Sequence, residues 1–176
     1  MTEAREAVFV RPAGLEDLPC VRACFKEYTA WLDQDISFQN YEDEYANLPG
    51  KYAPPTGGLL LAIDAVSDDI LGCVAFRKLV ISDGYRSPYQ FLNSSNQYCE
   101  LKRLYVFPEA RGKHAARRLT QAAIDSARIA GYQKIFLDTM PWMHAALSLY
   151  RSEGFDQTTP YYHSPLEGTL FFVRDL

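Results

Sequence analysis

The sequence predicts one mixed α/β domain, and three observations support this fold class. The chain has 176 residues, a length that suits a single domain over residues 1–176. Strand-like apolar runs alternate with helix-like patterns from residue 97 onward. Residues 100–119 read as a strand, a short turn and a helix start in direct succession. Elements in this order form a sheet covered by helices.

The first half of the chain predicts three strands and up to three helices, from apolar periodicity and from Gly and Pro positions. The polar stretch Val66-Ser67-Asp68-Asp69 lies between two apolar runs, which is typical of a hairpin turn. In order, we expect a strand at 7–12, one amphipathic helix or two short ones at 15–32, a short acidic helix at 40–48, a loop at 49–58, and strands at 58–65 and 70–79.

The second half begins with a polar, turn-rich segment and then alternates between strands and helices. In order, we expect an extended connection at 81–96, a strand at 97–107, a helix at 111–130, a strand at 134–139, a helix at 142–153 and a closing strand at 169–174.

The apolar pattern of the strand at 97–107 changes phase. Strict alternation would place Leu101 on one face and both Leu104 and Val106 on the other. A β-bulge near Lys102 and Arg103 would return all three apolar residues to one face. We therefore expect a bulge that bends this strand and disrupts its pairing.

The turn after this strand has the chemistry of a phosphate site. Pro108 ends the strand, and Arg111–Lys113 opens a helix whose first amides lack partners within the helix. Free amides, the positive end of the helix dipole and nearby cations favour a polyphosphate. Small side chains at Ala115 and Ala116 let such a group approach the backbone closely.

This turn resembles the acetyl-CoA loop of the Gcn5-related N-acetyltransferases (GNAT), R/Q-x-x-G-x-G/A, which here reads Arg111-Gly112-Lys113-His114-Ala115-Ala116. His114 stands where that family has its middle glycine. Three further stretches are similar to the family, the last of them to its small bacterial-type members. They are Glu100-Leu-x-x-Leu-x-Val-x-Pro108, Ala146-Leu-Ser-Leu-Tyr-Arg-Ser-Glu-Gly-Phe155 and residues 160–170.

The resemblance implies a GNAT fold: a mixed, mostly antiparallel central sheet of six to seven strands, with flanking helices and a splayed parallel pair at its centre. It also implies acetyl-CoA as co-substrate, with no metal. The pantetheine arm would bind along Leu104, Tyr105 and Val106, and the pyrophosphate at the loop over residues 111–116.

The resemblance further assigns two catalytic positions. Glu100 would act as the base for an amine that is mostly protonated at neutral pH, and Tyr150 as the acid for the leaving thiolate. Met143 stands where many relatives have a coenzyme-contacting asparagine. Each position has a structural alternative. Glu100 reads equally as an exposed strand residue, and Tyr150 fits the apolar stripe of an amphipathic helix with Met143 and Leu147.

A covalent route through Cys99 is disfavoured, because no histidine lies nearby in sequence and a buried strand thiol explains this residue. Tyr161 and Tyr162 are candidate substrate contacts, although core or surface aromatics explain them equally well. The acidic residues Asp33, Asp35, Glu42 and Asp43 favour a cationic acceptor or form a solvated face.

Composition excludes several other classes of protein. A net charge of −4 with dispersed Lys and Arg gives no reason to bind nucleic acid. The sequence contains no apolar run of membrane-span length, and residues 1–6 lack the apolar core of a signal peptide, so we expect a cytoplasmic protein. The four cysteines and three histidines show no metal-ligand spacing.

The resemblance implies the function of an N-acetyltransferase, which moves an acetyl group from acetyl-CoA to a primary amine by direct attack in a ternary complex. The acceptor would be a small-molecule or peptide amine, and a homodimer is left open. The alternative is a CoA-binding sensor or interaction module that keeps the fold with little turnover, as the departures at His114 and Met143 suggest.

Overall fold

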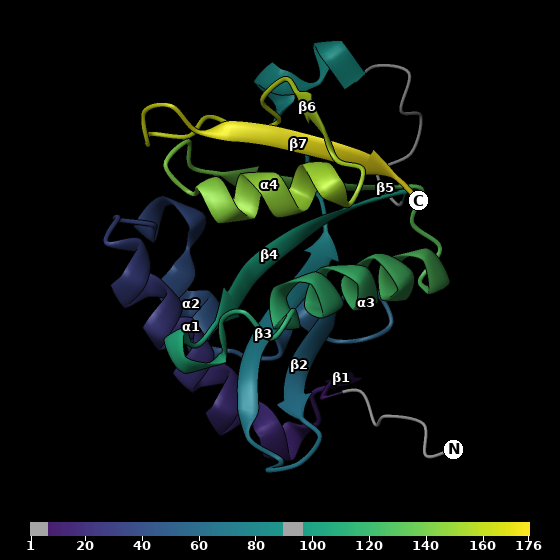
Figure 1. Ribbon diagram of the computed structural model, residues 1–176. Helices are drawn as coiled ribbons and strands as arrows, with labels where there is room; N and C mark the ends of the chain where they lie inside the picture. Colours follow the sequence, from purple (N-terminus) through teal and green to yellow (C-terminus); the bar gives the residue numbers. More distant parts are fainter. Residues whose placement is uncertain (1–6, 90–96) are drawn as a thin grey trace.

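The computed structural model describes residues 7–89 and 97–176. The end of the expected connection at 81–96 and the N-terminal residues 1–6 therefore lie outside the described residues. In the described part the chain forms a seven-stranded sheet in the order β1-β2-β3-β4-β5-β7-β6 (Figure 1). The strands are β1 Val8–Pro12, β2 Gly58–Asp64, β3 Ile70–Lys78, β4 Tyr98–Val106, β5 Lys134–Thr139, β6 Asp156–Thr158 and β7 Leu170–Asp175.

The strand directions confirm the predicted fold class. The pairs β1–β2, β2–β3, β3–β4, β5–β7 and β6–β7 are antiparallel, and β4–β5 is parallel. The hairpin expected between residues 58 and 79 is present as β2 and β3. The sheet is therefore mixed and mostly antiparallel, with its parallel pair in the middle.

In residues 7–89 and 97–176, four α-helices cover the sheet, two on each face (Figure 1). The helices α3 and α4 lie on one face, and α1 and α2 lie behind the sheet in this view. Short 3-10 helices connect several elements. The α-helices are α1 Leu18–Leu32, α2 Tyr41–Ala46, α3 Ala115–Ile129 and α4 His144–Ser152, and the 3-10 helices are Leu15–Asp17, Ser37–Gln39, Gly50–Tyr52, Asp83–Tyr85, Ser87–Tyr89 and Pro108–Ala110.

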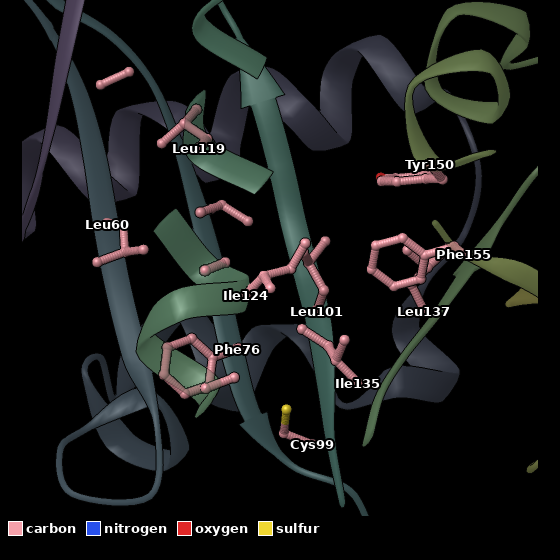
Figure 2. Close-up of a cluster of buried hydrophobic side chains, with 14 of the residues drawn as sticks. Leu60, Phe76, Cys99, Leu101, Leu119, Ile124, Ile135, Leu137, Tyr150 and Phe155 are labelled. Atoms are coloured by element: carbon pink, nitrogen blue, oxygen red, sulfur yellow. The ribbon is translucent and has the colours of Figure 1, made fainter. Parts of the chain in front are cut away.

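The two faces of the sheet bury separate apolar clusters. On β2, Leu60 joins the cluster beneath α3, whereas Leu59 and Leu61 join the cluster beneath α1. A strand that is buried on both faces reads as a continuous apolar run, which is the pattern of residues 58–63. Figure 2 shows the first cluster, where side chains of the sheet and α3 meet Tyr150 and neighbouring residues.

Two boundaries differ from the prediction for physical reasons. The helix expected from residue 111 begins at Ala115, because Gly112 and His114 both adopt positive φ and cannot continue a right-handed helix. The three-residue strand β6 was not predicted, since Asp156–Thr158 is too short to show an apolar period.

Candidate active site

The parallel strands β4 and β5 separate in the middle of the sheet. Their paired residues run only from Tyr98 to Glu100 on β4, opposite residues 134–136 on β5. Beyond Glu100, the described part of β4 pairs with β3 but no longer with β5. The edge of residues 101–106 that faces β5 is therefore open to a ligand, because its backbone groups lie outside the ladder.

A β-bulge accompanies the separation, as predicted. Ala75 pairs with Lys102 and Cys73 pairs with Tyr105, so three steps on β4 lie opposite two on β3. Arg103 lies in the bulge at φ 57°. Leu101, Leu104 and Val106 all contact the α3-side core, as the bulge requires.

The side chain of Arg103 secures this strained backbone. Its guanidinium donates to Glu44 Oε2 at 2.7 Å and to Gln39 Oε1 at 2.9 Å, and it lies 5.3 Å from the ring centre of Tyr41. Positive φ in a residue other than glycine costs on the order of 1–3 kcal/mol. Contacts to α2 and to the 3-10 helix before it offset this cost and anchor both elements to the bulge.

The space between the separated strands is a cavity that reaches both faces of the sheet, which we call the strand-gap cavity. Tyr150 and Ala146 of α4 line it on one face, and Tyr28 and Trp31 of α1 line it on the other. Its residues are Tyr28, Trp31, Leu32, Ile36, Gln39, Leu101, Lys102, Arg103, Leu104, Asp138, Thr139, Met140, Met143, Ala146, Tyr150 and Leu166.

Tyr150 belongs to the core and to this cavity at once. Its side chain is 6% exposed, and its ring contacts Phe155 at 5.8 Å between centroids. Figure 2 shows the ring extending from α4 toward β4. Burial, with the neighbouring Tyr28 and Asp138, raises the pKa of Tyr150, so the phenol stays protonated at neutral pH. The structural alternative for Tyr150 and the catalytic one are therefore compatible.

Glu100 lies on the opposite face of the sheet, held by a cross-strand partner. Arg77 pairs with it in register on β3, and Arg77 Nε donates to Glu100 Oε1 at 2.8 Å. Glu100 is 6% exposed, so it is not the exposed strand residue of the structural alternative. Its other carboxylate oxygen, Oε2, has no hydrogen-bond partner among the described residues.

Glu100 lines a second cavity of about 610 Å³, which we call the tyrosine cavity. Both candidate substrate residues, Tyr161 and Tyr162, line it. Gln39 and Lys102 line this cavity and the strand-gap cavity alike, so the two cavities adjoin at this pair, which we call the junction. The residues of the tyrosine cavity are Phe38, Gln39, Asn40, Arg77, Leu79, Val80, Ser82, Glu100, Lys102, Tyr161, Tyr162, His163 and Pro165.

Asp138 of β5 connects the residues around the junction. Its carboxylate accepts from Lys102 Nζ at 3.3 Å and from the Tyr162 hydroxyl at 3.1 Å. Lys102 is 6% exposed and also donates to Gln39 Oε1 at 3.1 Å. A buried ammonium needs such partners, because an unpaired charge away from water is costly.

The turn between β4 and α3 has the geometry expected of an amide cradle. Gly112 has φ +84° and His114 has φ +61°, and the first helical bond of α3 runs from the Arg118 amide to the His114 carbonyl. The amides of residues 115–117 therefore precede the hydrogen-bonded part of the helix. A positive φ at residue 114 explains why a glycine suits this position of the family pattern.

The two cations predicted to bind phosphate lie at this turn and make other contacts. Arg111 stacks over the ring of Trp31, 5.9 Å from its centre, and Lys113 Nζ lies 3.1 Å from Asp64 Oδ2. The side chain of Lys113 is 47% exposed. A pyrophosphate at the cradle would compete with Asp64 for this exposed ammonium.

The sequence-predicted residues thus fall into two groups. The two adjoining cavities are lined by Glu100, Leu104, Tyr150, Tyr161 and Tyr162. The turn at the end of β4 and the start of α3 contain Arg111, Gly112, Lys113, His114, Ala115 and Ala116. Between them lie Tyr105, whose ring contacts Trp31 at 6.2 Å, and Val106, which is opposite Gly72 on β3.

Sequence reasoning missed several residues at these cavities: Arg77, Lys102, Asp138, Gln39 and Trp31. One signal was present, because three of them are charged residues inside apolar strands. Charges in such positions are paired when buried. It also missed Gly72, where an added Cβ would lie 2.2 Å from the Tyr105 carbonyl oxygen.

Other predicted features have structural outcomes. Cys20, Cys24, Cys73 and Cys99 are free thiols. Cys99 is fully buried, and burial raises its pKa, which agrees with a structural thiol. In residues 7–89 and 97–176, no group of three or more His, Cys, Asp or Glu side chains could hold a metal ion. None of the helices in those residues has the length and apolar character needed to cross a membrane.

Both the sequence and the fold of this chain are similar to those of known proteins. The sequence profile of the Acetyltransferase (GNAT) family matches residues 22–155. An uncharacterized N-acetyltransferase of Schizosaccharomyces pombe is 36% identical over 161 residues, which is 92% of this chain and 90% of the relative. One of Dictyostelium discoideum is 29% identical over 205 aligned positions, covering 90% of this chain and 94% of the relative.

Solved structures of low sequence identity share the fold. A GNAT-family acetyltransferase from Staphylococcus aureus superposes with a TM-score of 0.69 at 18% identity, covering 96% of this chain and 99% of that one. The yncA protein of Salmonella typhimurium, solved with its cofactor acetyl-CoA, gives 0.64 at 20% identity, with 96% and 94% covered. The profile match and the long alignment to the yeast relative show that the chain belongs to the acetyltransferase (GNAT) family.

Proposed function

We propose that the protein transfers an acetyl group from acetyl-CoA to a primary amine by direct attack in a ternary complex. Membership in the family makes it an acetyl-CoA-dependent acetyltransferase. The observation that carries the direct mechanism is the passage through the sheet between β4 and β5. Tyr150 lines the strand-gap cavity on one face of the sheet, and the tyrosine cavity adjoins it at Gln39 and Lys102, which line both.

The residues of the chain fit the coenzyme. The β4 edge at Leu104, Tyr105 and Val106 lies beyond the last β4–β5 pair, so its backbone can bind the pantetheine arm. The amides after the left-handed turn at Gly112 and His114 can bind the pyrophosphate, since a helix N-terminus favours anions. When bound, acetyl-CoA supplies the activated thioester.

The catalytic groups would act from opposite faces of the sheet. An unperturbed alkylamine has a pKa of about 10 and must lose a proton before it attacks. Glu100 is the proposed base, acting directly or through a water, with Arg77 fixing one carboxylate oxygen and leaving Oε2 to accept the proton. Tyr150 is the proposed acid, which donates to the departing thiolate from within the strand-gap cavity.

A buried thiol at Cys99 does not support a covalent route. Its pKa is raised by burial, and it packs in the α3-side core beside Ile135 and Leu101. A thiolate there would be poorly solvated, and thiolates are the nucleophilic form. Direct transfer therefore needs no enzyme-bound intermediate on this residue.

The test combines turnover with coenzyme binding. Purified protein is mixed with acetyl-CoA and a panel of amines and peptides, free thiol is followed over time, and acetylated amine is identified by mass spectrometry. We expect thiol release coupled to acetylated product. Calorimetric binding of desulfo-CoA without thiol release for any amine or peptide would favour the coenzyme-binding module instead. Absence of heat with desulfo-CoA would overturn both functions.

A further inference from the structure

We propose that the acceptor is an amino-acid-type amine, with a free carboxylate and an apolar side chain, which binds in the tyrosine cavity. This inference rests on the proposed function, because it names the substrate class of the same site. Family membership does not determine that class. The solved relatives include a spermidine N-acetyltransferase of Vibrio cholerae and a ribosomal-protein-alanine N-acetyltransferase of Brucella melitensis, whose acceptors differ in charge and size.

The first observation is an orphaned hydroxyl in the cavity wall. Tyr161 is 1% exposed, and its hydroxyl has no hydrogen-bond partner among the described residues. Phe136 and Phe171 hold its ring, with centroids 5.5 and 5.1 Å away. A buried polar group without a partner is energetically unfavourable. Because Tyr161 lines the tyrosine cavity, we assign its unpaired hydroxyl to donate to an oxygen of the ligand.

The second observation is a surplus of cationic donors at the same cavity. A guanidinium has five N–H donors and an ammonium has three. Arg77 Nε donates to Glu100, while Arg77 Nη1 is 4.0 Å from Glu44, beyond hydrogen-bond distance. Lys102 bonds only Gln39 and Asp138 among the described residues. Arg77 is paired with Glu100 and Lys102 with Asp138, so the charges balance, and what favours a carboxylate is the set of N–H donors that these pairs leave unused in the cavity wall.

The acidic residues that favoured a cationic acceptor do not line this cavity. Asp33, Asp35 and Glu42 are exposed, and none of them lines either of the two joined cavities. Asp43 lines a neighbouring hollow. The acidic stretch is therefore mostly a solvated face. A polyamine needs a carboxylate for each of its ammonium groups, and among the described residues the wall of the tyrosine cavity offers only the unpaired oxygen of Glu100.

The remaining walls favour an apolar side chain. Phe38 and Tyr162 stack at 6.3 Å with an interplanar angle of 29°, and Leu79 and Val80 complete this part of the lining. With its carboxylate at Arg77 and Tyr161, the acceptor would keep its amine beside Glu100, the proposed base, which lines the same cavity.

Matched acceptors that differ by one carboxylate test this inference. L-phenylalanine is compared with phenethylamine, L-leucine with isoamylamine, and spermidine is added as a polyamine. We expect kcat/KM to be at least tenfold higher for each amino acid, the size of one charge-assisted hydrogen bond. Equal values, or a preference for the decarboxylated amines or spermidine, would overturn the proposal.

A conservative variant links the preference to the orphaned hydroxyl. Tyr161→Phe keeps the ring, so it should lower the ratio of kcat/KM for L-phenylalanine to kcat/KM for phenethylamine several-fold. Tyr98→Phe is the matched control, because Tyr98 is 4% exposed in the same aromatic cluster and does not line the tyrosine cavity. An unchanged ratio in Tyr161→Phe would contradict the assigned role of Tyr161.

Product binding separates failure of this inference from failure of the proposed function. If no amine releases thiol, the proposed function fails, yet the cavity can still be tested at equilibrium. With CoA present, N-acetyl-L-phenylalanine should bind at least tenfold more tightly than N-acetylphenethylamine by calorimetry. Equal affinity, or no binding of either compound, would overturn the carboxylate assignment whatever the turnover result.

Discussion

Replacement of Tyr150 by Phe is the most direct test of the proposed chemistry. The change deletes one hydroxyl from the strand-gap cavity and keeps a ring that is 6% exposed and packed against Phe155. No hydrogen bond joins the Tyr150 hydroxyl to another described residue. The free energy of unfolding should therefore change by less than about 1 kcal/mol, because no bonded partner is left unsatisfied.

The expected catalytic effect is much larger than the effect on stability. Proton donation by a positioned side chain contributes about 10²–10⁴ in rate. A hundredfold loss in kcat corresponds to about 2.7 kcal/mol of activation free energy. The raised pKa of Tyr150 keeps the phenol protonated in the neutral range, so the donor is available before the variant removes it. Affinity for CoA should stay within about twofold, because the ring and the β4 edge are unchanged.

The assay measures kcat at saturating acetyl-CoA, together with CoA affinity and melting temperature. Tyr132→Phe is the matched control. Tyr132 is 6% exposed in the same core, and its hydroxyl donates to the Thr56 carbonyl at 2.6 Å, away from the residues that line the two joined cavities. This control should lose about 1 kcal/mol of stability and keep wild-type kcat. Wild-type kcat in Tyr150→Phe would assign Tyr150 to packing alone.

Three further predictions concern the base, the strand separation and the N-terminal ion pair. Glu100→Gln should lower kcat/KM at pH 7 by about 10²-fold and recover as pH rises toward the amine pKa; a wild-type rate at neutral pH would remove Glu100 from the mechanism. Gly72→Ala should cost about 1–3 kcal/mol in thermal unfolding and weaken CoA binding, because the added Cβ would meet the β4 backbone, whereas Gly84→Ala, with nothing within 4 Å, should match wild type. Asp17 accepts from Arg11 at 2.9 Å, which lowers its pKa to about 2. Since this folded pKa lies below the unfolded value of about 3.9, the pair stabilises the fold above pH 4 and this contribution is lost between about pH 4 and 2. Melting temperatures over this range should fall more steeply for wild type than for Asp17→Asn, and parallel curves would refute the assignment.

Several site features were predictable because their signals are local in sequence. The phase change between Leu101 and Leu104 predicted the bulge that the register confirms. The residues of the turn predicted that β4 ends before Pro108 and that a helix follows. This helix, α3, begins at Ala115, which is later than the pattern indicated. The catalytic and coenzyme roles assigned by resemblance stay predictions, since geometry alone does not test them.

The sequence by itself determined the fold class. The spacing of apolar residues, the turn residues and the strand-turn-helix succession are each set by a few neighbouring residues, and together they predict the order of strands and helices. Only the tertiary structure decided which charges meet at the cavities. Arg77 and Glu100 are 23 residues apart, and Lys102 and Asp138 are 36 apart. Such pairs depend on strand register and sheet order, which local patterns do not fix. The same holds for the Tyr161 hydroxyl, whose lack of a partner follows from how distant segments pack around it.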